Sequence, residues 1–590
     1  MTALVSERIA LVKRLIAWGV AIVVLYSATT AFVLFLSLSA TYKQFQVIES
    51  KLSKSEVIAP GLLDALNQSA QSADQAAQDP TLAMTELLPW VGSDVHAARV
   101  LAHGIKQNTQ VITPLFEQGN SLSIARGNMP NTLNVLSSSV DELLTSITSF
   151  NSELRTVDPK SLHFGIGPKI GKLKDYVSKA KVTISQGAPI LKSAAILLNQ
   201  PKSSTWFLAT QNAAELRASG GLLGSYAVIE IDKGALKLLD YGSDRKLLSR
   251  GKLRVSYASG IDNVWGADFT DWRDLNVSSN IPDDGKIIAD AWKQKYGQQL
   301  DGVMFFSQGT VAHLVSALGG ITVASQDLTG SNTVDFLTKV IYAKYPNVDQ
   351  KNKMVSEVMK TLFGKLSNEK INLKGLISGL ANPSNQDSIF LWSQNDDIQS
   401  KIRKYKIDGG LDKTYGSSLI VSLNNGGGNK LDAYLKSAYF YSQGKCGLKT
   451  FDGLRARQSQ VKIILTNEAP AKGLPVYVNP RLDLHTGQKH NPGSNREVVT
   501  IYAPVGSSDE KIFVDGAEEG ATFSNYLNHP IYNLSVELNP GQTKTVTVDF
   551  IEPVTDSLGA AISQKPSLRS QRTLGGSMSK VVSGPYCQAG

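Results

Sequence analysis

Hydrophobic and polar positions follow different rhythms in successive parts of this chain. Residues 15–41 form one unbroken apolar stretch, and residues 42–200 repeat apolar side chains at helical spacing. Short strands then alternate with helices, and from residue 446 short alternating strands dominate. Periods near 3.6 residues predict helices, and strict alternation predicts strands. The pattern therefore predicts an α+β multidomain protein built from these parts in order.

The apolar stretch is long enough to cross a membrane. No charged residue occurs between Arg14 and Lys43, whereas about 20 apolar residues suffice to span the hydrocarbon layer. A cleaved signal peptide usually has only ~7–15 apolar residues before a small-residue cleavage site. The segment Ser37–Ala40 could serve as such a site. The length nevertheless favours an uncleaved transmembrane helix over residues 15–41.

The charges that flank this helix predict its orientation. Arg8, Lys13 and Arg14 precede it, whereas only Lys43 follows it closely. Because positive residues remain on the cytoplasmic side, residues 1–14 are expected in the cytoplasm and the rest of the chain outside. No later stretch is comparably long without charge. We therefore expect a single-pass protein of the cell membrane.

Residues 42–200 are expected to form a helical, coiled-coil-like stalk. Two sets of apolar residues step by three and four positions, as coiled-coil seams do. Prolines interrupt the pattern, so the stalk should consist of several antiparallel helices that could also support oligomers. The alternative is the helical half of a mixed domain. The first seam is Leu63, Leu66, Ala70, Ala73 and Ala77, the second is Leu133, Leu136, Val140, Leu143, Ile147, Phe150 and Leu154, and the prolines are Pro80, Pro89, Pro114 and Pro130.

Residues 204–445 are expected to form an α/β core domain, because strand-like and helix-like segments alternate there. The expected strands are Trp206–Ala209, Leu222–Ile231, Asp301–Ser307 and Ile321–Val323, with a hairpin turn at Asp232–Gly234. The expected helices are Asp283–Tyr296, Val311–Leu318, Thr333–Ala381 and Lys430–Tyr441.

Residues 446–590 are expected to form a small β-sandwich, because short strands there are separated by Gly, Pro and Asn. The strand-like segments begin at Val461, Glu497, Glu510 and Thr543. Residues 564–590 contain basic but no acidic residues, which predicts a basic C-terminal tail.

The loop between the first two core strands is the strongest candidate for chemistry. It carries Glu215, Arg217, Gly220 and Gly221. Glycines allow backbone N–H groups to turn toward an anion, and an arginine beside them would add positive charge. This arrangement predicts an anion-binding pocket at the edge of the sheet. The alternative is a tight turn with a solvated arginine.

The cysteine content predicts one disulfide. The two cysteines, Cys446 and Cys587, lie in the part expected outside, where an even number indicates a disulfide. Two unpaired buried thiols are the alternative.

The net charge of +9 is spread along the chain without a dense basic run, which argues against nucleic-acid binding. It suits an anionic bilayer surface or a cell-wall polymer.

Several motifs resemble the bacterial family called domain of unknown function 4012. They run through most of the chain beyond the membrane segment, in the family's order. The resemblance implies a membrane-anchored envelope protein. The motifs are L-L-P-W-V-G-S-D-V-H-A-A-R (87–99), Q-N-A-A-E-L-R-A-S-G-G-L-L-G-S-Y (211–226), D-W-R-D-L-N-V-S-S-N-I-P (271–282), L-D-G-V-M-F-F-S (300–307), L-G-G-I-T-V (318–323), L-W-S-Q-N-D-D-I-Q (391–399), N-K-L-D-A-Y-L (429–435) and L-T-N-E-A-P (465–470).

The core from Trp206 to Val323 is also distantly similar to the LytR-CpsA-Psr phosphotransferases. Those enzymes move a polyprenyl-pyrophosphate-linked glycopolymer to the cell wall. By this resemblance, Arg217, Arg245 and Arg273 would hold phosphate, and Asp244, Asp271 and Asp274 would hold Mg²⁺. Positive charge of this kind offsets the charge that develops on a transferring phosphate.

The chain departs from the transferase pattern at two places. Ser219, Gly220 and Gly221 stand where those enzymes place an aspartate, and Ser243–Arg245 stands where they carry Pro-Arg-Asp. We therefore expect a non-catalytic binding or scaffold protein, with the phosphotransferase as the alternative. No catalytic residue is assigned, and Mg²⁺ is expected only with the transferase. A lipid bilayer is the expected partner, joined by a cell-wall polymer or a polyprenyl-linked lipid.

Overall fold

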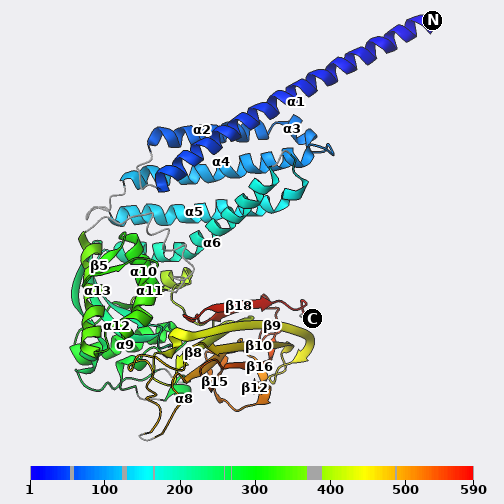
Figure 1. Cartoon of the computed structure of the whole chain (residues 1–590). Helices are drawn as coiled ribbons and strands as arrows, with labels where there is room; N and C mark the ends of the chain where they lie inside the picture. Colours follow the sequence, from blue (N-terminus) through cyan, green and yellow to red (C-terminus); the bar gives the residue numbers. More distant parts are fainter. Residues whose placement is uncertain are drawn as a thin grey trace. The chain divides into compact units, whose positions relative to one another are not determined.

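The computed structural model describes residues 2–53, 59–121, 129–163, 166–257, 260–266, 269–368, 389–485 and 488–588. The chain divides into two compact units, Met1–Ala195 and Ile196–Gly590. The first contains helices only, and the second contains several sheets with helices around them (Figure 1). The expected mixed α and β composition is confirmed, with the helices concentrated toward the N-terminus.

The helical unit is built from α1 and the antiparallel helices that follow it. Ile48 of α1 packs against the start of α2, and Leu34 packs against its end, which fixes the two helices as antiparallel. The helices are α1 (Thr2–Ser53), α2 (Pro60–Ala77), α3 (Pro80–Thr85), α4 (Gly92–Ser121), α5 (Met129–Thr156), η1 (Pro159–Ser161) and α6 (Gly167–Leu198). Helix α4 continues past Pro114, where the sequence predicted an interruption.

The predicted seams form the interior of this unit. All five residues of the seam from Leu63 to Ala77 are buried. In α5, Ile147, Phe150 and Leu154 pack with α4 and α6, while the side chains of Leu133 and Leu136 lie outside the described part. Gly104 of α4 allows a close approach, because a Cβ there would lie 1.9 Å from the Phe150 ring. The apolar residues at three-four spacing therefore pack against neighbouring helices of this unit.

Helix α1 carries the apolar segment. Within the described residues, one helical stretch, Val23–Ile48, is long and apolar enough to cross a membrane, with a mean hydropathy of 1.9. The helix does not end at residue 41, because it continues without a break to Ser53. Tyr26 donates a hydrogen bond to Asp79 over 3.0 Å. Helix α1 therefore contacts the bundle well before residue 42, where the stalk was predicted to begin.

The second unit begins with a five-stranded sheet in the order β3-β2-β1-β4-β7. Only β1 and β4 pair in parallel, and the other neighbours are antiparallel. The predicted hairpin turn is confirmed, with positive φ at Lys233 and Gly234. The strands are β1 (Ser204–Asn212), β2 (Leu222–Asp232), β3 (Ala235–Ser243), β4 (Gly302–Phe306) and β7 (Ile389–Ser393). The predicted strand β5 (Ile321–Val323) lies outside this sheet and pairs with β6 (Gln326–Leu328).

Helices cover both faces of the five-stranded sheet. Helix α9 contributes Trp292 to a core shared with Phe207 and Phe305, and α13 contributes Met359, whose sulfur contacts Thr210 on the opposite face. Residues 369–381 of the predicted helix Thr333–Ala381 lie outside the described residues. The helices are α7 (Asp244–Leu248), α8 (Asp262–Trp265), η2 (Trp272–Asp274), α9 (Ile281–Tyr296), α10 (Gln308–Ala317), α11 (Thr333–Asp335), η3 (Phe336–Val340), α12 (Ile341–Lys344), α13 (Val348–Asn368) and α15 (Asp396–Lys404).

Two further sheets follow, in the orders β13-β12-β16-β10-β9-β18 and β14-β15-β11-β8-β17. Side chains of both sheets form one buried apolar cluster, because alternate residues of their strands face the same interior. Their strands are β8 (Ser418–Asn425), β9 (Leu435–Lys449), β10 (Arg455–Asn467), β11 (Asn495–Tyr502), β12 (Ser508–Val514), β13 (Ala517–Glu518), β14 (Thr522–Tyr526), β15 (His529–Leu538), β16 (Thr543–Pro553), β17 (Ser567–Ser570) and β18 (Ser577–Val582).

Three expectations about this region are wrong. The segment Lys430–Tyr441 is not a helix, because a short 3-10 turn η5 (Leu431–Tyr434) leads directly into β9. The domain boundary predicted at residue 446 falls inside β9, and β8 already belongs to the same pair of sheets. Residues 564–590 were expected as a tail, yet they contain β17 and β18, which pair in parallel with β8 and β9. Tertiary pairing therefore overrides the weak local pattern.

The predicted disulfide is present between Cys446 and Cys587, which are 141 positions apart. It joins the end of β9 to the chain beyond β18. Beside it, the buried Arg457 donates a hydrogen bond to the carbonyl oxygen of Pro585 over 2.5 Å and to Gln564 over 2.8 Å. The C-terminal segment is thus held at its end as well as by its strands.

Candidate functional site

The loop after β1 turns back sharply because two glycines lie against the end of that strand. A Cβ on Gly220 would lie 2.7 Å from the Gln211 side-chain oxygen, and one on Gly221 would lie 2.4 Å from the Asn212 backbone. The φ of Gly220 is +142°, which L side chains rarely adopt. Both glycines are therefore required for the close packing of the loop, whether or not an anion binds there.

Arg217 is buried and paired with carboxylates. Its guanidinium lies 3.1 Å from Glu215 and 3.1 Å from Asp274, and it also donates to the carbonyl oxygen of Leu216 over 2.9 Å. Lys430, also buried, makes a second ion pair with Glu215. Burial opposes the ionisation of Glu215, but Lys430 and Arg217 outweigh it and hold the pKa of this carboxyl below its usual range. The loop arginine serves an internal salt-bridge cluster.

The other predicted arginines are paired as well. Arg245 lies 2.6 Å from Asp349 at the surface, and Arg273 lies 2.6 Å from Asp271. Hydrogen bonds to Asp271 raise the pKa of Arg273, with additional contributions from the charges of Asp244 and Asp274. The structure therefore brings several of the predicted residues together around Arg273. The arginines that were predicted to bind phosphate are, however, already paired with carboxylates.

The three predicted metal ligands each have protein partners. Asp271 binds Arg273 and Asp274 binds Arg217, while Asp244 accepts a hydrogen bond from the backbone of Arg245 over 2.9 Å. Burial raises the pKa of Asp244 above its usual range. Among the described residues, no three His, Cys, Asp or Glu side chains are arranged to hold one metal ion.

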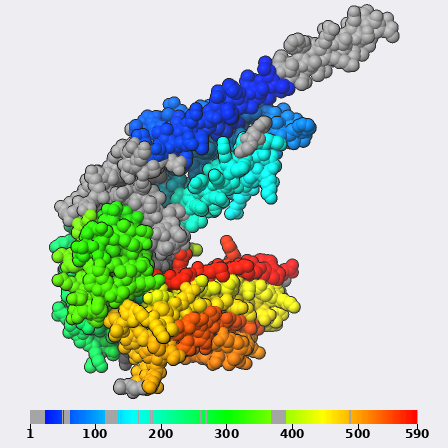
Figure 2. Space-filling model, viewed as in Figure 1, coloured from blue at the N-terminus to red at the C-terminus, as the bar shows by residue number. Residues whose placement is uncertain are grey.

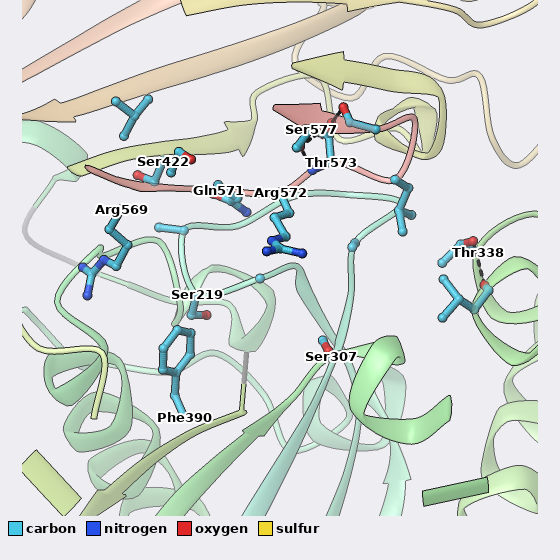
Figure 3. Close-up of a pocket in the computed structure, with 18 of the residues that line it drawn as sticks. Ser219, Ser307, Thr338, Phe390, Ser422, Arg569, Gln571, Arg572, Thr573 and Ser577 are labelled. Atoms are coloured by element: carbon cyan, nitrogen blue, oxygen red, sulfur yellow. Dashed lines mark hydrogen bonds between the residues drawn. The ribbon is translucent and has the colours of Figure 1, made fainter. Parts of the chain in front are cut away.

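A cavity of about 590 Å³ lies on the other side of the same loop (Figure 3). It borders the carboxyl ends of the parallel strands β1 and β4, the position where open α/β sheets place ligands. Ala218–Gly220 and Ser307, the residue that caps α10, line one side, and β8 and residues 569–577 line the other. Hydroxyl groups come from Ser219, Ser279, Ser307, Ser331, Thr338, Ser422, Ser570, Thr573 and Ser577, and apolar side chains from Ile281, Val334, Phe390, Ile420, Val421 and Leu574.

Arg569 supplies an uncompensated positive charge to the cavity wall. It donates to the carbonyl oxygen of Gly409 over 2.7 Å and to that of Ser279. Within the described ranges, no carboxylate forms an ion pair with it. Burial therefore lowers the pKa of Arg569 to about 10, against weaker support from the surrounding negative groups. A bound anion would compensate this charge.

Arg572 is exposed and points into the open space of the cavity (Figure 3). The neighbouring Gln571 fixes this segment, since it donates to the carbonyl oxygen of Arg217 over 2.6 Å and accepts from the backbone of Leu423 over 2.8 Å. Lys339 and Asp335 also line the cavity and lie 3.9 Å apart. The lining thus contains three cationic side chains and one carboxylate.

The sequence analysis missed Arg569 and Arg572 because they follow the loop by some 350 positions. The only local signal was that residues 564–590 contain no acidic residue. Of the five residues predicted to bind an anion, Gly220 alone lines the cavity, while Gly221, Arg217, Arg245 and Arg273 do not. The two arginines that line this cavity therefore lie in the C-terminal segment.

A second buried polar cluster joins the loop to the sheet that contains β8 and β11. Asp432 accepts hydrogen bonds from the backbone of Leu216 over 2.6 Å and from Asn425 and Asn495 over 2.9 and 2.6 Å. Asn425 also caps the turn 424–430, accepting from the backbones of Gly427 and Gly428. The motifs beginning at Gln211 and Asn429 therefore meet in one network.

Glu497 joins this network by accepting a hydrogen bond from Asn495 over 2.7 Å. Burial, followed by the neighbouring charge of Asp432, raises its pKa well above the usual range. The unfolded chain ionises this group above about pH 4.3, whereas the raised pKa makes the folded chain retain the proton to a higher pH. The contribution of Glu497 to stability is therefore complete below that pH and is lost as the pH rises toward the folded pKa.

Glu497→Gln is expected to flatten the decline in the free energy of unfolding as the pH rises above about 4.3, because the amide cannot ionise. Chemical unfolding at a series of pH values measures this slope. Glu518→Gln, which alters an exposed carboxylate, is the matched control and should leave the slope unchanged. Equal slopes in wild type and Glu497→Gln would show that the buried acid is ionised in the folded protein.

Comparisons with known proteins identify a family match over part of the chain. Residues 202–342 match the model of the family described as "Protein of unknown function (DUF4012)", which confirms the family prediction over these residues. No curated protein matches the chain. A solved structure from Legionella pneumophila, titled as a "putative nutrient binding protein", is 14% identical over 24% of this chain and 45% of that chain, with a TM-score of 0.15. This likeness is too low to carry an argument about fold or ligand.

Proposed function

We propose that this chain is a membrane-anchored envelope protein that binds an anionic ligand without transforming it. Its residues 202–342 match the DUF4012 family model. In this proposal α1 is the anchor, and the second unit lies outside the cell. The two C-terminal sheets act as a β-sandwich that presents residues 569–577 to the α/β core. The observation that carries the proposal is the cavity containing Arg569 and Arg572.

The size and lining of the cavity indicate the class of ligand. A volume of about 590 Å³ lies within the usual range of ~300–1,000 Å³ for small-molecule sites. Arginine side chains favour phosphate or carboxylate groups, and many serine and threonine hydroxyls can exchange hydrogen bonds with a polyhydroxylated molecule. The ligand chemistry that fits is a sugar unit bearing a phosphate or carboxylate, as in a wall polymer or a lipid-linked sugar.

The phosphotransferase remains the alternative, because Asp244, Asp271 and Asp274 lie around Arg217 and Arg273 on the opposite face of the loop. A transferase would need these aspartates to exchange their protein partners for Mg²⁺. This reaction would also require polyprenyl pyrophosphate to displace the existing ion pairs. In the cavity, by contrast, Arg569 binds backbone carbonyl oxygens and forms no ion pair with a carboxylate of the described residues.

Arg572→Gln is expected to weaken binding of an anionic sugar about tenfold or more, because a charge-assisted hydrogen bond contributes ~1.5–3 kcal/mol. The probe is glucose 1-phosphate, titrated calorimetrically into the full chain in detergent. Glucose and inorganic phosphate are titrated separately to resolve the contributions of the sugar and the anion. Because Arg572 is exposed, its replacement should leave the fold intact.

Lys565→Gln provides the matched control, since it removes an exposed charge from the same segment but does not line the cavity. Equal affinity in Arg572→Gln and wild type, or no binding of any probe, would overturn the cavity proposal. A parallel titration with polyprenyl pyrophosphate and Mg²⁺ tests the alternative. Turnover that is lost in Asp244→Asn would favour the transferase.

A further inference from the structure

The connection between α3 and α4 exposes an unusual concentration of apolar side chains. Leu87 is 84% exposed and Trp90 is 81% exposed. Met84 in the last turn of α3 is 67% exposed, and Leu88 and Val91 on the connection are 50% and 40% exposed. We call Met84–Val91 the apolar loop. Large apolar side chains clustered at a surface indicate an interaction site, whereas single exposed ones do not.

The apolar loop lies at one defined end of the helical unit. Asp79, just before α3, contacts Tyr26 of α1, and Arg99 of α4 donates to the carbonyl oxygen of Ala77 at the end of α2 over 2.7 Å. The start of α4 therefore lies beyond the end of α2, in the direction of the N-terminus of α1. Figure 1 shows the α3–α4 connection at the end of the bundle from which α1 projects.

The length of α1 places this end of the bundle close to a membrane. Only 12 positions separate Arg14 from Tyr26, a rise of about 18 Å along the helix, whereas the hydrocarbon layer is about 30 Å thick. A helix that crosses this layer from Arg14 reaches the other side near Leu34, about 20 residues later. Leu34 already packs against Ala77 and Leu82 of the bundle. The bundle end must therefore enter the interfacial layer.

Polar residues at this end limit how deeply it enters. Asp79 is hydrogen-bonded to Thr81 as well as to Tyr26, and because a carboxylate is costly in hydrocarbon, this residue limits how deeply the bundle end enters. Lys160 in the neighbouring α5–α6 connection and Lys169 in the first turn of α6 are exposed. His163 joins this connection to Asp94 near the start of α4 over 2.8 Å. Lysines near a membrane surface attract anionic headgroups. Tryptophan is the residue type enriched at that same boundary.

We propose that the apolar loop inserts into the outer membrane leaflet beside α1, as a second membrane contact that holds the helical unit against the bilayer. The inference rests on the proposed anchoring by α1. The partner in this proposal is a lipid bilayer that contains anionic headgroups. Figure 2 shows the described part of α1 at the surface of the helical unit, and apolar side chains are exposed both on α1 and on the apolar loop.

Environment-sensitive fluorescence tests the insertion in the full chain. Met84→Cys carries the dye, because the native cysteines are joined in a disulfide and do not react. The labelled chain is reconstituted into vesicles of phosphatidylcholine and phosphatidylglycerol that contain a lipid with a nitroxide near the glycerol end of its acyl chain. We expect a blue shift and nitroxide quenching at residue 84. Gln110→Cys, exposed on α4 18 positions beyond Gly92, should show neither.

A second variant separates insertion from mere proximity. Leu87→Asp and Trp90→Asp, introduced together into the Met84→Cys chain, should abolish the quenching, and because both side chains are exposed the bundle should remain folded. Vesicle flotation is measured in every sample. A chain that floats but shows equal quenching at residues 84 and 110 overturns the insertion while α1 anchoring stands. A chain that does not float overturns the anchoring itself.

Discussion

Replacing Arg217 by Met is expected to lower the free energy of unfolding of the second unit by about 3–5 kcal/mol, the usual cost of removing one partner from a buried ion pair. Glu215 is buried and would retain only Lys430 as a cationic partner. Asp274 would lose its ion pair as well. Urea unfolding followed by tryptophan fluorescence measures the change, because Trp206, Trp272 and Trp292 are buried in the same unit.

Arg245→Met is the matched control for this prediction. The Arg245–Asp349 pair is exposed, with side-chain exposures of 56% and 80%, and such pairs typically contribute about 0–1 kcal/mol. Adding Glu215→Gln to Arg217→Met should lower the stability further, because the buried Lys430 would then lose its carboxylate partner. Equal stability of Arg217→Met and Arg245→Met would refute the structural role assigned to Arg217.

Removal of the disulfide is expected to have an effect of similar size. The Cys446–Cys587 bond closes a loop of 141 residues, and the entropic model assigns such a loop about 4–5 kcal/mol of stabilisation. The double variant Cys446→Ser/Cys587→Ser should lose about this amount in urea unfolding. The loss should also free the segment that carries Arg569 and Arg572, so affinity for the anionic probe should fall with it.

Reduction of the wild-type protein provides the internal control for the disulfide. Dithiothreitol should shift the unfolding curve of the wild type toward that of the double variant and leave the variant unchanged. If reduction destabilises both proteins equally, the effect does not arise from this bond. If stability falls but ligand affinity does not, β17 and β18 alone are sufficient to position the cavity arginines.

The loop between β1 and β2 has two faces, one that forms a buried structural network and one that lines the candidate binding cavity. On one face, Glu215, Arg217 and Lys430 satisfy one another's charges, while Asp432 binds the Leu216 backbone. On the other face, Ser219 and Gly220 line the cavity. The segments 211–226 and 429–435 therefore maintain a buried network first, and they position the wall of a cavity through it.

The sequence by itself determined the features that depend on local pattern. An apolar stretch flanked by charges specifies the helix α1, a three-four spacing specifies the buried face of α2, and positive φ at Gly234 suits the turn after β2. Each of these depends on residues a few positions apart. The pairing of Cys446 with Cys587 also followed from sequence, because only two cysteines are present.

Only the tertiary structure decided which charges are satisfied and which face a cavity. Arg217 and Arg569 are both arginines in polar, glycine- or serine-containing segments, yet one binds two carboxylates and the other binds backbone carbonyl oxygens beside an open space. Electrostatic energy depends on distance and burial, and the chain brings together residues some 350 positions apart. Helical or strand periodicity contains no information about such distances, so local sequence could identify the loop but not the residues opposite it.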